Sequence, residues 1–211
     1  MKPEGVKPEG APAGVRGVSH ALFDRWARFA GSRAAVVLLF AWAFAEATVW
    51  PILADFLLVA LALAVPGRLR VLLPAIVAGM ALGGLVSVLT AHQFPAFAMD
   101  VVRELPLVRD VQVERARDLL DEHGAFLGFL YQPISGVPFK IWAAVAGDER
   151  LPPGVVITAF VLGRSARMLA TGGVAAGAGH LLRRYVRDWF AAIAPLYVLA
   201  FAIGLAQVVG R

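Results

Sequence analysis

Long apolar stretches, separated by short polar connections, make up most of the chain. A helix rises 1.5 Å per residue, so about twenty residues cross the roughly 30 Å hydrocarbon layer of a membrane. Five stretches have about this length or more: residues 34–65, 71–91, 125–147, 155–179 and 189–209. The pattern predicts an all-α integral membrane protein with one membrane domain over residues 20–211.

Two further segments mix apolar and charged residues at helical spacing. In the larger, residues 99–123, the pattern predicts an amphipathic helix at the membrane surface that Pro106 interrupts near its start. The same kind of pattern in residues 21–30 predicts a second interfacial helix. Residues 1–19 contain Lys-Pro-Glu-Gly twice and lack the apolar core of a secretory signal, so they are predicted to form a disordered cytosolic tail.

Composition supports the membrane class and removes several others. Hydrophobic residues make up 59% of the chain and the mean hydropathy is +0.72, which is too apolar for an ordinary soluble domain. The chain has no cysteine, which excludes disulfides, thiolate metal ligands and thiol nucleophiles. Walker, zinc and dinucleotide motifs are absent, so no cofactor or metal is predicted. Nucleic acid is not an expected partner, because no basic stripe is interleaved with aromatic residues.

Stretches 34–65 and 125–147 differ from the others because they carry polar residues and prolines near their middles, where lipid could not satisfy freed backbone groups. As a straight helix the first would measure about 48 Å, which exceeds one crossing. The residues in question are Glu46, Thr48, Pro51, Asp55, Gln132, Pro133, Ser135, Gly136, Pro138 and Lys140. Each broken stretch precedes a short arginine-bearing loop and a glycine-rich apolar stretch. We therefore predict two inverted repeats, each a re-entrant helical hairpin followed by a transmembrane helix, and a C-terminal transmembrane helix. The hairpin breaks are assigned to Pro51, Pro133, Gly136 and Pro138.

The glycines of the two glycine-rich stretches are expected to allow close helix packing rather than to contact a ligand. They are Gly79, Gly83, Gly84, Gly163, Gly172, Gly173 and Gly177.

Arginine placement predicts the orientation of the chain. If the two broken stretches are hairpins, one side of the membrane collects Arg25, Arg28, Arg33, Arg68, Arg70, Arg183, Arg184 and Arg187. If they were full crossings, Arg68 and Arg70 would lie opposite the others. The arginine-rich side is expected to be cytoplasmic, which places the N-terminus there too.

Five charged residues lie inside apolar stretches: Glu46, Asp55, Lys140, Arg164 and Arg167. Each costs roughly 2.5 to 3.5 kcal/mol at the centre of a membrane helix, so we expect carboxylates and arginines to pair across the two halves. In a functional interpretation the carboxylates bind and release protons while the basic residues and Gln132 hold an anionic head group. The alternative is that the ion pairs only fix helix packing.

An enzymatic interpretation has little support. The sequence Pro133-Ile134-Ser135-Gly136 contains a serine in a turn, but the glycine that an intramembrane serine protease has two positions before its serine is missing. No histidine within an apolar stretch could serve as its base. We therefore predict that the chain is not an enzyme.

Three groups of residues resemble the DedA, or VTT-domain (SNARE-associated), family of membrane proteins. They are Phe44-Ala45-Glu46 with Trp50-Pro51 and Asp55, then the run from Gln132 through Pro133-Ile134-Ser135-Gly136-Val137-Pro138-Phe139 to Lys140, and finally Gly163-Arg164 with Arg167. The resemblance covers roughly residues 34 to 180. It implies two facing re-entrant hairpins, a bacterial cytoplasmic (inner) membrane location and movement of lipids between leaflets. Bacterial members are linked to proton-coupled recycling of undecaprenyl phosphate, and eukaryotic relatives to phospholipid scrambling.

The chain departs from the family at one point. Many bacterial members carry two arginines around the proline of the second hairpin, where this chain has Gln132, Gly136 and Lys140. The phosphate-binding role would then fall to Lys140, Arg164 and Arg167, or the lipid would differ from undecaprenyl phosphate.

The expected function is that of a lipid transporter, flippase or scramblase that moves a polyprenyl phosphate or phospholipid between leaflets with proton coupling. Its expected partners are membrane lipids with anionic phosphate head groups, protons and, in a homo-oligomer, further copies of the chain. A non-transporting membrane scaffold or homeostasis protein, and an ion or proton leak pathway, are the alternatives.

Overall fold

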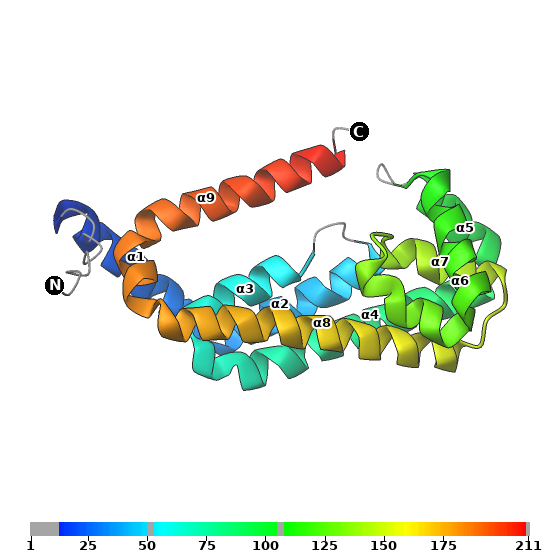
Figure 1. The fold of residues 1–211 in the computed structure, drawn as a ribbon, viewed down its shortest axis with the longest axis horizontal. Helices are drawn as coiled ribbons and strands as arrows, with labels where there is room; N and C mark the ends of the chain where they lie inside the picture. Colours follow the sequence, from blue (N-terminus) through cyan, green and yellow to red (C-terminus); the bar gives the residue numbers. More distant parts are fainter. Residues whose placement is uncertain (1–12, 50–52, 105–107, 210–211) are drawn as a thin grey trace, which may run out of the picture.

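The computed structural model describes residues 13–49, 53–104 and 108–209, and this part of the chain is 90% helix, without a strand. The α-helices, with two 3-10 turns, are α1 (Ala13–Ala30), α2 (Arg33–Thr48), α3 (Asp55–Ala64), η1 (Pro66–Arg68), α4 (Leu69–Gln93), α5 (Pro95–Glu104), α6 (Asp110–Tyr131), η2 (Gln132–Ile134), α7 (Phe139–Asp148), α8 (Pro153–Leu181) and α9 (Arg183–Val209). The long helices α4 and α8 pack against each other along the longest axis of the molecule (Figure 1). The predicted all-α class is confirmed.

Three segments are long and apolar enough to cross a membrane: Pro66–Gln93, Pro153–Leu181 and Arg183–Ile203. A fourth candidate arises if Arg16–Ala30 and Arg33–Thr48, which are bent by 71° at their junction, count as one span. The prediction of a membrane protein is confirmed at this level. Helix α3 is also apolar but has only 10 residues, about 15 Å at 1.5 Å per residue, or half the hydrocarbon thickness.

The chain reverses direction twice near the middle of the molecule (Figure 1). Helix α2 runs away from the α1 end and α3 runs back toward it; the end of α6 and the following α7 likewise run in opposite directions. Helix α2 packs on α4 and α6 packs on α8, whereas α3 packs on α8 and α7 packs on α4. Each long helix therefore contacts one segment from its own half of the sequence and one from the other half.

Close helix contacts explain five of the seven glycines singled out above. A Cβ at Gly79 would overlap the carbonyl oxygen of Phe40, and one at Gly163 would lie 2.8 Å from the carbonyl oxygen of Leu130. Gly83, Gly84 and Gly172 are similarly crowded. Gly173 and Gly177 have nothing within 4 Å of the added atom, so the packing role predicted for them is wrong.

The predicted amphipathic helix over residues 99–123 is two helices, α5 and α6, and Pro106 lies outside the described residues. Helix α6 also extends past residue 123 into apolar stretch 125–147, but a kink interrupts it at Gly124, whose backbone angles (φ 73°, ψ 169°) are not helical and are readily adopted by glycine. The polar character of the segment ends at this kink, which separates two helical pieces.

Helix α1 begins at Ala13, so the boundary predicted for the disordered tail, residue 19, is too late; residues 1–12 lie outside the described part. The early start has a packing reason. Ser19 is fully buried and its Oγ accepts a hydrogen bond from the Ala191 N–H at 3.1 Å, and Phe23 meets Phe190 edge-to-face at 5.5 Å. These contacts attach α1 to the first turns of α9.

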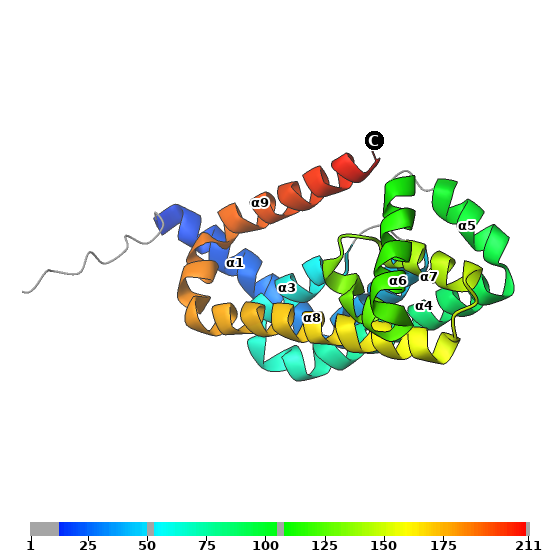
Figure 2. The same cartoon turned by 45° about the vertical axis from the view of Figure 1, so that its right-hand side comes forward.

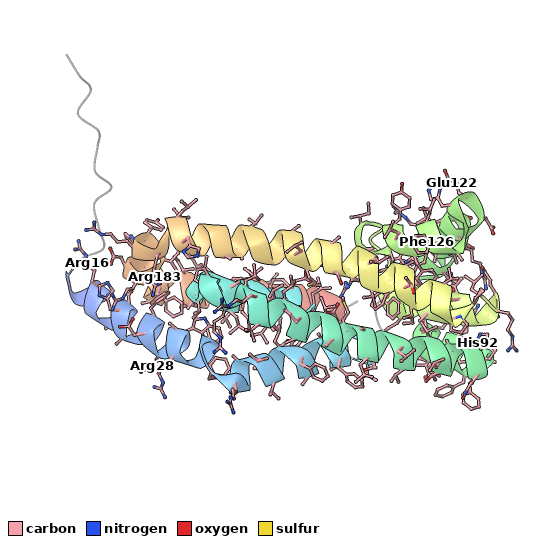
Figure 3. All side chains as sticks on the ribbon, turned by 90° about the horizontal axis from the view of Figure 1, so that it is seen from below. Arg16, Arg28, His92, Glu122, Phe126 and Arg183 are labelled. Carbon is pink, nitrogen blue, oxygen red and sulfur yellow. The ribbon has the colours of Figure 1, made fainter. Side chains whose placement is uncertain are left out.

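The elements that carry the eight arginines expected on one side meet at one end of the molecule. These are α1, the start of α2, η1 with the start of α4, and the α8–α9 junction (Figure 1). Arg28 and Arg183 lie at this end, and His92 and Glu122 at the other (Figure 3). Arg68 and Arg70 therefore share one end of the molecule with the other arginines.

Candidate functional site

Glu46 and Asp55 lie on either side of the first reversal of the chain. Glu46 is in the last turn of α2 and its Oε2 accepts a hydrogen bond of 2.8 Å from the Ala54 N–H, just before α3 begins at Asp55. The first N–H groups of a helix lack partners within it and carry partial positive charge. The start of α3 therefore favours both carboxylates. Pro51, the break predicted here, lies outside the described residues.

Helix α8 supplies a cation to each carboxylate. Arg164 donates from Nη2 to Oε1 of Glu46, and Arg167, one turn later, donates from Nη2 to Oδ2 of Asp55 at 2.9 Å. Arg164 is 4% exposed and Asp55 8%. At this site two ion pairs therefore join the first and second halves of the chain. Removing one partner of a buried pair destabilises a protein strongly, because the other charge stays buried without compensation.

The second reversal contributes a backbone acceptor. Arg167 also donates from Nη1 to the carbonyl oxygen of Pro133 at 3.3 Å. One guanidinium therefore joins the start of α3 to the turn between α6 and α7. Proline cannot continue a regular helix, which leaves carbonyls in this turn free to accept such a bond.

Gln132 serves the turn itself rather than the charged side chains. Its Nε2 donates to the carbonyl oxygen of Val137 at 3.1 Å. The Ser135 Oγ donates to the carbonyl oxygen of Gln132 at 2.9 Å and accepts from the Val137 N–H at 3.1 Å. Gly136 has a φ of 75°, a left-handed conformation, and Pro138 directly precedes α7. Gln132, Gly136 and Pro138 therefore shape the turn that holds the Pro133 carbonyl.

Lys140 lies in the first turn of α7, near enough to Glu46 for an electrostatic interaction. The structure thus brings together the five charged residues found inside apolar stretches. We call Glu46, Asp55, Lys140, Arg164 and Arg167 the charge cluster. With all five ionised, three cations against two carboxylates leave a net charge of +1.

Several buried polar atoms at the cluster have no hydrogen-bond partner among the described residues: Asp55 Oδ1, Arg164 Nε and Gln132 Oε1. Nearly all buried polar groups in proteins are paired, because an unpaired one costs about 1 to 3 kcal/mol. One donor and two acceptors are therefore available to a ligand or to water.

Two contributions to the site were not predicted from the sequence. The Ala54 N–H and the Pro133 carbonyl are backbone groups, whose roles depend on where the chain turns rather than on residue type. Ser135, named in the sequence analysis but given no role at the site, stabilises the turn. The prolines gave the only signal that free backbone groups would occur here.

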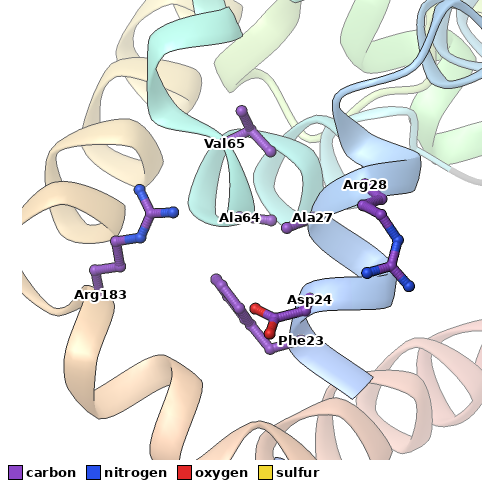
Figure 4. Close-up of a pocket in the computed structure, with 7 residues that line it drawn as sticks. All are labelled: Phe23, Asp24, Ala27, Arg28, Ala64, Val65 and Arg183. Carbon is purple, nitrogen blue, oxygen red and sulfur yellow. The ribbon is translucent and has the colours of Figure 1, made fainter. Parts of the chain in front are cut away.

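Two cavities lie away from the charge cluster, and neither is lined by any of its members. The smaller, of about 430 Å³, lies at the arginine-rich end, with Arg28 and Arg183 on opposite sides and Asp24 between them (Figure 4). Asp24 pairs with Arg187 at 2.7 Å. The larger, of about 1070 Å³, lies between α1, α3 and α9.

No protein-family model matches the chain, and neither a curated protein nor a solved structure is significantly similar to it. The helices and the charge cluster define a helical membrane protein with compensated charges in its interior.

Proposed function

We propose that the chain moves a phosphate-bearing lipid, a polyprenyl phosphate or a phospholipid, between the leaflets of a membrane. The observation that carries this proposal is the charge cluster, with its net charge of +1 and its unpaired Arg164 Nε. A guanidinium matches the geometry of phosphate oxygens and keeps its charge when partly buried. Charged groups within membrane segments commonly mark a transport pathway.

The proposed topology has two re-entrant hairpins, α2–α3 and the end of α6 with α7, that enter from opposite sides and meet at the cluster. The exchange of partners between α4 and α8 supports this, because two inverted repeats that interlock would each pack on the long helix of the other. The hydrogen bond from Arg167 to the Pro133 carbonyl lies where the two tips would meet. The same arrangement is what the resemblance to the DedA family implies.

The arginine-rich end is proposed to face the cytoplasm of a bacterium, with the N-terminus on that side of the inner membrane. Cytoplasmic ends of membrane helices carry an excess of Lys and Arg. The meeting of α1, η1 and the α8–α9 junction at one end supports this orientation.

Proton coupling would follow from competition for the arginines. When Asp55 takes up a proton, Arg167 loses its negative partner and its guanidinium becomes available to a phosphate oxygen. When the phosphate leaves, the carboxyl returns its proton and the ion pair forms again. The Asp55 carboxylate and the head-group phosphate thus alternate at Arg167, a proton is carried together with the head group, and charge stays balanced in both states.

The test uses the purified full chain in vesicles with trace amounts of head-group-labelled phosphatidylglycerol, undecaprenyl phosphate or a glycolipid without phosphate, with and without a pH gradient. We expect transport of at least one phosphate-bearing lipid and not of the glycolipid. Glu46→Gln and Arg164→Lys should reduce transport, whereas Glu122→Gln and Arg103→Gln, at exposed positions far from the cluster, should not. Unchanged transport in folded Glu46→Gln and Arg164→Lys variants would overturn the site assignment.

One observation favours the scaffold alternative. Both oxygens of Glu46 already have partners, Arg164 and the Ala54 N–H, as in a structural ion pair. In a scaffold, Glu46→Gln would lower the melting temperature and no lipid transport would be found even in the unmodified chain. The vesicle experiment separates the two functions.

A further inference from the structure

Helix α9 leaves the body of the molecule and encloses the larger cavity. It packs against α1 near its start and then extends away from α8 (Figure 2). Only 6% of its apolar window is buried inside the protein, against 33% and 39% for the other two candidate spans. The cavity of about 1070 Å³ lies between this weakly packed helix, α1 and α3.

The cavity wall is almost entirely apolar, and two of its aromatic residues direct their polar atoms into the backbone. Trp26 donates from Nε1 to the Ala60 carbonyl at 3.2 Å, and Tyr197 donates from its hydroxyl to the Phe56 carbonyl at 2.6 Å. Both acceptors belong to α3. A water molecule needs two to four polar partners to be held in a cavity, and the N–H and O–H donors of these two side chains are already used.

The one charge in the wall identifies the kind of ligand. Among the described residues that line the cavity, Arg25 alone is charged, and its side chain is exposed. Arg25 is on α1, at the arginine-rich end, where Arg28 and Arg183 are also found. An aliphatic body with an anionic group at one end complements this wall, and the volume is at the upper end of the roughly 300–1000 Å³ of ligand pockets.

We propose that this cavity binds an anionic phospholipid, with its acyl chains between α3 and α9 and its phosphate at Arg25. The cavity opens beside a candidate span, where the surrounding solvent is lipid. A second copy of the chain fits less well, since it would bring another arginine-rich end toward Arg25. The proposal needs only a membrane location and does not require transport.

The cavity lies beside the helix that carries Asp55, because Phe56 in its wall directly follows Asp55 on α3. A lipid held here would have its tails along α3, whose first turn carries Asp55. The site is nonetheless separate from the cluster, and its occupancy can be measured without a transport assay.

The test measures quenching of tryptophan fluorescence in the full chain by lipids with brominated acyl chains, since Trp26 and Trp42 line the cavity. Brominated phosphatidylglycerol or phosphatidylcholine is titrated into vesicles of unlabelled phosphatidylcholine that contain the protein. Lipid around the protein quenches in proportion to its mole fraction, whereas a specific site adds a component that saturates at low mole fraction. We expect that component with phosphatidylglycerol.

Ala194→Phe places a ring in the cavity from α9, and Ala192→Phe is its matched control on an exposed position of the same helix that does not line the cavity. We expect Ala194→Phe to weaken the saturable component about tenfold or more, as when bulk is forced into a packed space, and Ala192→Phe to leave it unchanged. Ala60→Leu fills the same cavity from α3 if the α9 variant does not fold.

Arg25→Gln should remove the preference for phosphatidylglycerol over phosphatidylcholine, while Arg103→Gln, on α5 at the other end, should not. Equal curves for folded Ala194→Phe and Ala192→Phe would overturn the site, as would a purely proportional response. A dimer in light scattering that Ala194→Phe alone dissociates would show that a second copy occupies the cavity instead. Absence of transport in the unmodified chain, with lipid binding intact, would contradict the proposed function and leave this inference standing.

Discussion

Arg164 donates a hydrogen bond to Glu46 across 118 positions of the sequence, and the two side chains are 5% and 11% exposed. The contact joins the end of α2 to the middle of α8. Because a buried ion that loses its partner has no water to replace it, each residue of this pair depends on the other. The pair is therefore both a packing constraint and a candidate ligand site, and stability measurements can assess the first role separately.

Arg164→Ala should destabilise the protein by about 3 to 5 kcal/mol, because Glu46 would remain buried without its cation. The double variant Glu46→Leu with Arg164→Leu should recover most of that loss, since apolar residues of similar size can replace a buried pair at little cost. Denaturant unfolding in detergent measures both. A double variant that is no more stable than Arg164→Ala would contradict this account of the pair.

Asp55→Asn tests the proposed proton site with little change in shape. Arg167 keeps its hydrogen bond to the Pro133 carbonyl, and its side chain is 29% exposed, so we expect a smaller loss of stability than for Arg164→Ala. Transport driven by a pH gradient should fall about tenfold, equivalent to about 1.4 kcal/mol in the barrier. Asp100→Asn, at an exposed position on α5, is the control. Full gradient dependence in folded Asp55→Asn would remove Asp55 from the coupling step.

Gly163→Ala and Gly173→Ala form a matched pair on α8. The new methyl at residue 163 would lie 2.8 Å from the Leu130 carbonyl oxygen and 3.3 Å from Pro133 Cγ, whereas at residue 173 it meets nothing within 4 Å. Gly163→Ala should therefore cost about 1 to 3 kcal/mol through overpacking. Gly173→Ala should be neutral or stabilise by up to about 1 kcal/mol through helix propensity. If the two variants changed the melting temperature equally, the close approach of α8 to the turn between α6 and α7 would be contradicted.

Much of this arrangement could be predicted from the sequence, because a membrane sets the length of a helix that crosses it and disfavours unpaired charges. A 10-residue apolar helix such as α3 cannot cross alone, and buried carboxylates need cations, so the broken segments and the charged residues were identifiable. Which carboxylate pairs with which arginine could not be predicted. The pairing depends on the rotation of α8 about its axis and on how closely glycines such as Gly163 let α8 approach its neighbours. From the sequence alone, Glu46 could equally well pair with Arg167.

Other features depend on tertiary structure that no local pattern encodes. Helix α6 is kinked at Gly124, where the pattern of residues changes from amphipathic to apolar, and the backbone is helical on both sides of the kink. Gln132 was expected to reach a head group, but the tight turn around Gly136 brings the Val137 carbonyl within its reach. The cavity beside α9 depends on the angle at which that helix leaves α8. The sequence of residues 189–209 shows only that the helix is apolar.

Glu149, at the end of α7, makes the stability of the protein depend on pH. Desolvation raises the pKa of its carboxyl above the usual 4.5, and the charges of Asp121 and Asp148 add to this while Arg117 opposes it. The folded state thus holds the proton more tightly than the unfolded state. The stabilisation is complete below the unfolded pKa and is lost as pH rises through the higher folded pKa.

Glu149→Gln should remove this contribution. We expect unfolding curves recorded from pH 4 to pH 7 to show a smaller fall in stability for the variant than for the unmodified chain, and a higher melting temperature for the variant at pH 7. Glu122→Gln, whose side chain is 70% exposed in the unmodified chain, should leave the pH profile unchanged. A lower melting temperature of Glu149→Gln at pH 7 would mean that attraction to Arg117, 3.7 Å from the carboxylate, outweighs desolvation and the neighbouring acids.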